Sequence, residues 1–189
     1  VAVLTAAIVT AGWLALARRA LHTTDRPATV RERPGLGWFA VLPSNAFGAV
    51  AARSLVYWLR DRRYIVNFVI VPFAGVLTVI PLRVAGVPLE IAAALPVAVM
   101  ALFFGWLPHN DVAYDSTAFW IHVASGVRGV PDRLGRLVPV ALVAIPTIAI
   151  AIPITLVVIG RWSLLPVLIG VVASLLLSGL GLSSVFSVA

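Results

Sequence analysis

Four long stretches of this chain are apolar and almost free of charge, and this feature limits the folds open to it. They are residues 64–82, 89–107, 137–159 and 164–188, and among them only the second contains a charged residue, Glu90. A helix needs about 20 mostly apolar residues to cross the hydrocarbon core of a bilayer. A transmembrane barrel would instead show short alternating strands, a pattern that this sequence lacks. The sequence therefore predicts an all-α, polytopic bundle of transmembrane helices.

Composition agrees with this class. Hydrophobic residues make up 61% of the chain and charged residues 11%, whereas soluble domains carry about 25% charged residues. Residues 1–17 are a further apolar block, and no basic segment precedes it as in a signal peptide. We interpret it as a fifth, truncated span, and we expect the chain to be part of a longer protein. The whole of 1–189 is then one transmembrane domain with about five spans.

All fourteen basic residues are arginines, and they give a net charge of +7. They lie at the ends of apolar blocks, which favours the positive-inside rule over nucleic-acid binding. If the loop 18–44 is cytoplasmic and the spans alternate, only Arg83 and Arg161 lie outside, and the other twelve arginines lie inside. The sequence thus predicts a multi-pass protein of the cytoplasmic membrane, without a nucleic-acid partner.

Residues 45–63 predict an amphipathic helix directly before the first complete span. Its apolar residues recur at helical spacing, and arginines occupy another face. A basic face opposite Trp, Phe and Leu is typical of a helix that lies in the membrane interface, although an ordinary packing helix shares this pattern. The candidate residues of this interfacial helix are Phe47, Arg53, Trp58, Arg60, Arg62 and Arg63.

Residues 110–136 form a polar interruption between two spans. A helix that begins at Asp111 places Asp115 and His122 on the same stripe, and we expect that stripe to be the wet face of a surface helix. Gly126, Gly129 and Pro131 are expected to break the helix. Such a segment offers a soluble partner a place to dock.

Several kinds of chemistry have no signature in this sequence. Without lysine there is no P-loop, without cysteine there is no thiolate site, and the zinc-protease and nucleophile-elbow motifs are absent. Asp111, Asp115 and His122 span too long a rise to hold one ion together. The sequence therefore predicts no enzyme activity, no cofactor and no metal site. The spans also lack internal charge, which argues against an ion-coupled carrier.

Three short motifs resemble permeases of the type-2 ABC transporter superfamily. They are YWLRDRR at 57–63 directly before a span, N-D-x-x-Y-D at 110–115, and Gly135-Arg136 at the start of the next span, where the family usually has Gly-Lys. The resemblance implies that 45–63 is the elbow helix and that 110–136 carries the coupling helix, which docks on a separate ATPase subunit. The implied coupling residues are Asn110, Asp111, Tyr114, Asp115, Arg128, Asp132, Arg133 and Arg136.

By the same resemblance, the chain is expected to be the permease subunit of an exporter. The spans carry no internal charge and few hydroxyl groups, which suits an amphiphilic or lipid-like substrate. The permease would work as a homodimer or with a second half of a longer permease. Gly170, Ser174 and Ser178 form a small-xxx-small ladder in the last span, for which we expect packing within the chain rather than a dimer contact. Two alternatives stay open: a secondary carrier or facilitator without an ATPase, and a membrane scaffold subunit.

Overall fold

The computed structural model describes residues 2–22, 37–115 and 118–187, and within these ranges the chain forms helices and turns with no strand. The chain divides into two units, residues 1–37 and 38–189. In the first unit, α1 (Ala2–His22) contains an apolar stretch, Ala7–Leu16, that is shorter than the spans of the second unit. The predicted span 1–17 therefore corresponds to α1. Most of the predicted loop 18–44 lies outside the described residues.

The second unit follows a simple order. Its elements are η1 (Gly37–Val41), α2 (Ala46–Arg60), α3 (Arg62–Leu77), α4 (Val79–Val84), α5 (Leu89–Ala92), α6 (Leu95–Trp106), η2 (Leu107–Asn110), α7 (Asp111–Asp115), α8 (Phe119–Ala124), α9 (Gly129–Ile159), η4 (Trp162–Leu164) and α10 (Leu165–Phe186).

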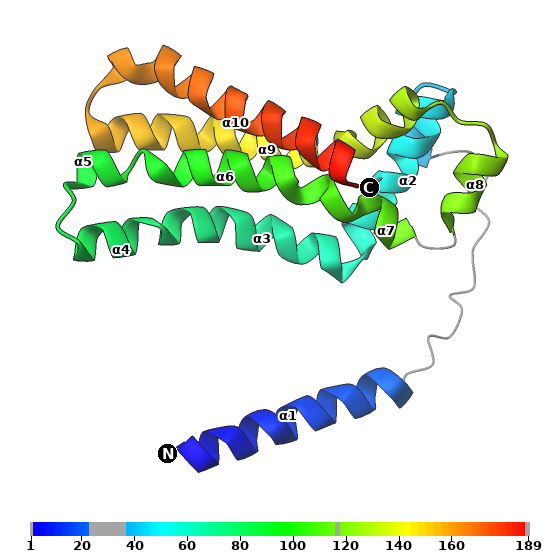
Figure 1. Cartoon of the computed structure of the whole chain (residues 1–189), viewed down its shortest axis with the longest axis horizontal. Helices are drawn as coiled ribbons and strands as arrows, with labels where there is room; N and C mark the ends of the chain where they lie inside the picture. Colours follow the sequence, from blue (N-terminus) through cyan, green and yellow to red (C-terminus); the bar gives the residue numbers. More distant parts are fainter. Residues whose placement is uncertain (1, 23–36, 116–117, 188–189) are drawn as a thin grey trace. The chain divides into compact units, whose positions relative to one another are not determined.

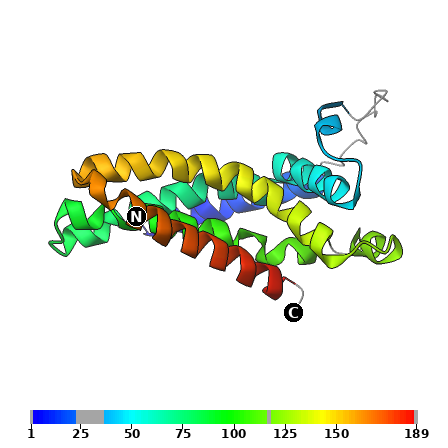
Figure 2. The ribbon, with the colours of Figure 1, turned by 90° about the horizontal axis from the view of Figure 1, so that it is seen from above.

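Four helical segments of this unit are long and apolar enough to cross a membrane: Arg62–Val84, Leu89–Asp115, Gly129–Ile159 and Trp162–Phe186. This confirms the predicted all-helical class, with four candidate membrane-spanning segments in this unit. The segments lie side by side, and α6 contacts α3, α9 and α10 (Figures 1 and 2). The shared core contains Trp58, Phe104, Val140 and Leu156, each almost completely buried.

Two glycines meet where α6 packs against α10. A Cβ atom on Gly105 of α6 would lie 2.9 Å from the Cα atom of Gly179 in α10, so only glycine allows this approach. The predicted ladder of Gly170, Ser174 and Ser178 lies elsewhere, and all three residues are exposed. The expectation that they pack within the chain is wrong, because α10 turns the face of Val172, Gly179 and Ser183 inward.

The predicted helix 45–63 is divided by Asp61. Asn45 caps α2 by accepting a hydrogen bond from the Gly48 backbone at 2.9 Å. At the other end Asp61 has an extended backbone and its side chain accepts from Arg63 N, so it caps α3. Arg62 and Arg63 therefore belong to the first turn of the first span. The guanidinium of Arg63 also bonds Asp61 and holds the pKa of that carboxyl below its usual value.

The segment 110–136 is not one surface helix. The described helix α7 ends at Asp115, and α8 starts at Phe119 and ends before Gly126, whose positive φ of 63° confirms the predicted break. Residues 129–136 are the first turns of the long α9, so the expectation that Gly129 and Pro131 break a helix is wrong. Pro131 is tolerated there because amides in the first turn have no acceptor within the helix.

Candidate functional site

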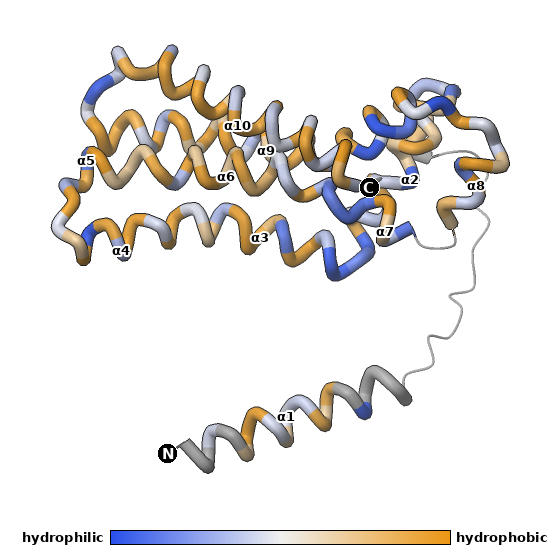
Figure 3. Tube along the Cα trace, viewed as in Figure 1, coloured by the Kyte–Doolittle hydropathy of each residue, from blue (hydrophilic) through white to orange (hydrophobic). Residues whose placement is uncertain are grey.

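Charged residues gather at one end of the second unit, which we call the polar end. Hydropathy along the chain changes there from apolar helices to hydrophilic turns (Figure 3). In residues 38–189 the opposite end, formed by the α4–α5 and α9–α10 connections, carries Arg83 and Arg161. The remaining arginines of this unit belong to the polar end: Arg53, Arg60, Arg62, Arg63, Arg128, Arg133 and Arg136.

Asp115, the last residue of α7, joins three helices at the polar end. It is 6% exposed. Its Oδ1 accepts from Arg53 Nη2 of α2 at 2.6 Å, and its Oδ2 accepts from Arg136 Nη2 of α9. Because each oxygen has its own guanidinium, the buried carboxylate is fully paired, which is the condition under which proteins tolerate a buried charge.

Asp132 and His122 close these contacts into a ring. Arg136 Nε donates to Asp132 Oδ2 at 3.0 Å, one turn earlier in α9. The other oxygen of Asp132 lies 2.8 Å from His122 Nδ1, and His122 Nε2 contacts Arg53 Nη1. Arg53, Asp115, Arg136, Asp132 and His122 thus form a closed cycle, which we call the ionic ring. Through it, α8 is attached to both α2 and α9.

The partners of His122 indicate the role of each ring nitrogen. A guanidinium nitrogen can only donate, so His122 Nε2 is placed to accept from Arg53, and Nδ1 faces the Asp132 carboxylate. The ring contains two arginines, two aspartates and one histidine. His122 Nδ1 and Asp132 Oδ1 are close but poorly aligned, and neither has a hydrogen-bond partner among the described residues.

Further contacts tie the ring to the other spans. Tyr64 of α3 donates its hydroxyl to Asp111 Oδ1 at 3.0 Å, and Arg136 Nη1 donates to the Asp111 carbonyl at 3.3 Å. Arg133 of α9 contacts the hydroxyl of Ser187, which caps α10. Every span of the second unit therefore has a polar contact at this end.

The structure changes the interpretation of the predicted coupling residues. Asp111 and Asp115 were expected on the wet face of a surface helix, and that expectation is wrong because both are buried and paired with groups of other helices. Asp132 and Arg136 are buried as well. The Arg63 guanidinium lies over the ring of Tyr114, with its Cζ atom 4.7 Å from the ring centroid. The predicted coupling residues that remain at least partly accessible are Asn110, Tyr114, Arg128 and Arg133.

The candidate residues of the predicted interfacial helix differ in their burial. Trp58 is buried and stacks on Tyr64, with ring centroids 5.2 Å apart. Arg53 belongs to the ionic ring, so it does not share one basic face with the exposed Arg60 and Arg63. The buried face of α2 packs on α9, where Gly135 allows contact with Val50. Phe47 is half-buried and Arg62 is exposed.

Helix α8 presents apolar side chains away from the bundle. Trp120, Ile121 and Val123 are 71%, 67% and 53% exposed. Both views place α8 beyond the ends of α6 and α10 (Figures 1 and 2). A short helix that is exposed on one face and held by His122 on the other can pass a displacement to α2 and α9.

Sequence reasoning missed Tyr64 and Ser187, and it placed His122 on a wet face. Arg53 and Asp115 are 62 residues apart, and no local pattern indicates that they meet. The sequence does contain one indication of these contacts. Aspartates and arginines occur together in the segment 110–136, which lies between two apolar stretches, and carboxylates that become buried there need charged partners.

The residues that the structure describes contain no group of three or more potential metal ligands, and the ring carboxylates face arginines and a histidine.

Comparison with protein-family models, with curated proteins and with solved structures finds no match in any of the three.

Proposed function

We propose that this chain is the permease subunit of a type-2 ABC exporter in the cytoplasmic membrane, powered by a separate ATPase subunit that docks on α8. The observation that carries this proposal is the position of His122. It belongs to the exposed α8, yet its two ring nitrogens face Arg53 of α2 and Asp132 of α9. A partner that moves α8 would therefore move two helices of the bundle.

The arginines support a cytoplasmic location for α8. Seven arginines of the second unit lie at the polar end and two at the other, and an excess of arginine marks the cytoplasmic side of a membrane protein. ATP is available on that side. A docking element for an ATPase is needed there and nowhere else.

The exposed side chains of α8 supply the contact. Trp120 and Ile121 offer a large apolar surface on a helix tip, and a buried tryptophan is a frequent centre of binding energy at protein interfaces. Arg128, exposed at the start of α9, adds a charge beside it. Coupling then requires that the ATPase grip α8 differently in its nucleotide-bound and nucleotide-free states. An amphiphilic or lipid-like cargo fits spans whose interior carries no charge.

Docking is tested by co-purification from native membranes. The tagged parent protein is compared with Trp120→Ala and with the matched Trp162→Ala, an exposed tryptophan at the opposite end. We expect an ATP-binding subunit to accompany the parent protein and Trp162→Ala, and its retention to fall about thirtyfold in Trp120→Ala. If the parent protein brings down no ATPase, the proposal fails and the carrier and scaffold alternatives take its place.

Transmission is tested separately with His122→Ala. This variant keeps the docking surface but breaks the link to Arg53 and Asp132, so we expect the ATPase to remain bound while stimulation of ATP hydrolysis by cargo is lost. Ser125→Ala is the control, because its hydroxyl bonds only to the carbonyls of Ile121 and His122 within its own helix. Equal stimulation in both variants would exclude the ionic ring as the transmitting element.

A further inference from the structure

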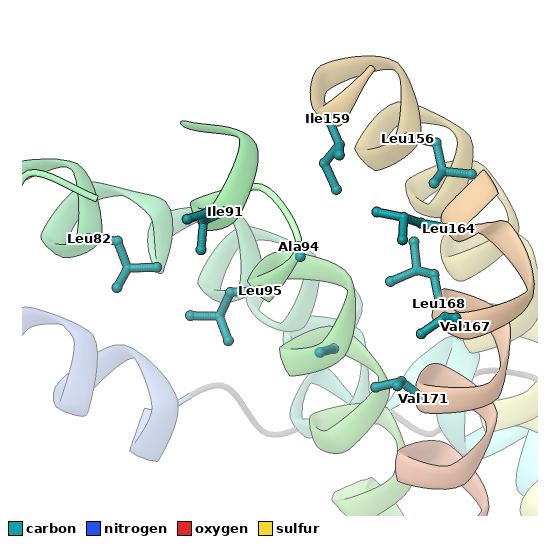
Figure 4. A pocket seen from close by; sticks show the side chains of 11 residues that line it. Leu82, Ile91, Ala94, Leu95, Leu156, Ile159, Leu164, Val167, Leu168 and Val171 are labelled. Atoms are coloured by element: carbon teal, nitrogen blue, oxygen red, sulfur yellow. The ribbon is translucent and has the colours of Figure 1, made fainter. Parts of the chain in front are cut away.

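An apolar groove of about 560 Å³ opens at the end of the bundle opposite the ionic ring. One wall comes from α4, α5 and α6, and the other from the end of α9, η4 and the start of α10 (Figure 4). Leu95 and Ala98 face the groove from the first wall, and Leu156, Leu164 and Leu168 from the second. Every residue that lines it is aliphatic.

We propose that this groove binds the hydrocarbon chain of an anionic phospholipid, with the phosphate held at Arg161 and Arg83. Binding of this lipid needs no ATPase, so the proposal stands or falls independently of the proposed function. It names a binding site in a part of the molecule that the ionic ring does not reach.

The lining selects for a hydrocarbon chain. The groove offers no side-chain donor or acceptor, so a polar ligand would lose its hydrogen bonds to water on entering. Its walls belong to segments that are long and apolar enough to cross a membrane, which makes the bilayer the source of the ligand. Its volume lies within the range of roughly 300–1,000 Å³ that is usual for small-molecule sites.

Apolar contact alone does not distinguish the groove from bulk lipid, because lipid tails surround every exposed span. The distinction comes from the charges next to the groove. Arg161 lies three residues before Leu164, and Arg83 directly follows Leu82, so both arginines adjoin lining residues. They are the basic residues at this end of the second unit.

The surroundings of the two arginines fit the depth of a lipid headgroup. Arg83 Nη1 donates to the Val87 carbonyl at 2.8 Å, which holds its guanidinium on the α4–α5 turn. Trp162, next to Arg161, is 56% exposed, as expected of an aromatic residue at the membrane interface. Glu90 adjoins the lining residue Ile91 and offsets one positive charge. The remaining single positive charge favours a headgroup with one negative charge.

Photo-cross-linking tests the proposal. The purified full chain is placed in bilayers that contain phosphatidylglycerol with a diazirine in its acyl chain, or phosphatidylcholine with the same chain, and labelled residues are mapped by mass spectrometry. We expect the phosphatidylglycerol probe to label residues 91–98 and 164–171 preferentially. Uniform labelling of all exposed spans by both probes would overturn the proposal, since it would show ordinary boundary lipid.

Matched variants separate the two parts of the site. Ala98→Trp fills the groove and should abolish the preferential labelling, whereas Ala149→Trp, on an exposed face of α9 outside the groove, should not change it.

Arg161→Gln should lower the preference for phosphatidylglycerol over phosphatidylcholine about fivefold, and Arg60→Gln at the polar end should leave it unchanged. Glu90→Gln should raise the preference. If Ala98→Trp has no effect, or if Arg161→Gln leaves the headgroup preference intact, the site is not the one proposed.

Discussion

The two ends of the second unit are held together in different ways. At the polar end, α2, α7, α8 and α9 meet through the paired polar side chains of the ionic ring, and Tyr64 and Ser187 connect the remaining spans to them. At the opposite end α4, α5, α6, α9 and α10 meet through aliphatic side chains and leave a groove between them.

This difference has a physical reason. A charge-assisted contact requires one geometry, because the guanidinium and the carboxylate must align and an unpaired buried charge is very costly. Aliphatic contacts within lipid have no such requirement, since a gap can fill with lipid chains that are as apolar as the side chains. The pairing therefore fixes the geometry of the polar end, whereas the opposite end tolerates a groove between its helices.

The largest expected effect comes from removing the central cation of the ionic ring. Arg136→Ala leaves Asp115 and Asp132 each with one fewer partner in a buried site, and we expect a loss of about 3–5 kcal/mol in the free energy of unfolding. Arg161→Ala at the opposite end should cost less than about 0.5 kcal/mol. Chemical unfolding in detergent micelles measures both. Equal stability of the two variants would contradict the distinction between the ends.

The next effect concerns the close crossing of α6 and α10. In Gly105→Leu the new side chain meets the backbone of α10, with Leu176 O 2.8 Å from the Cβ position, so we expect a loss of about 1–3 kcal/mol. Gly170→Leu in α10 is the control, because nothing lies within 4 Å of its Cβ position. Thermal unfolding of both variants gives the comparison. A destabilised Gly170→Leu would instead indicate that the exposed small-residue face has a partner.

A smaller effect is expected for the hydrogen bond that joins α3 to α7. Tyr64→Phe keeps the ring stacked on Trp58 but leaves Asp111 without its 3.0 Å donor, which should cost about 1.5 kcal/mol. Tyr57→Phe removes an exposed hydroxyl that accepts from Arg53 Nε and should cost less than half as much. Midpoints of chemical unfolding measure the difference. A neutral Tyr64→Phe would show that Asp111 finds another donor.

The smallest effect is expected in the groove. Ala98→Leu adds a side chain to open space and should change the free energy of unfolding by less than about 0.5 kcal/mol. Ala101→Leu, one turn along the same helix, adds the same atoms to a position that is completely buried and should cost about 1–3 kcal/mol. A costly Ala98→Leu would mean that the two walls of the groove close on each other in the membrane.

Much of the fold was predictable because it depends on local composition. The four runs of apolar residues place the spans, and Asn45 and Gly126 mark helix ends by local capping and backbone geometry. The distribution of arginine along the chain predicts which end faces the cytoplasm, and the structure leaves this as a prediction. The helix boundaries were less accurate, since the sequence pattern joined α2 to α3 across Asp61 and separated residues 129–136 from α9.

The candidate site depended on tertiary structure. Asp111, Asp115, Asp132 and Arg136 were identified from the sequence as a group, but their burial and pairing follow from contacts between helices that are far apart in the chain. The choice between the two small-residue faces of α10 has the same origin, because Gly179 is distinguished from Gly170 only by the presence of Gly105 opposite it. The sequence by itself determined that four segments are long and apolar enough to cross a membrane and which end of the second unit carries most of the charge. Only the packing of the helices decided which of these charged side chains pair in a closed ring and which remain exposed, because the pairs join residues far apart in the chain.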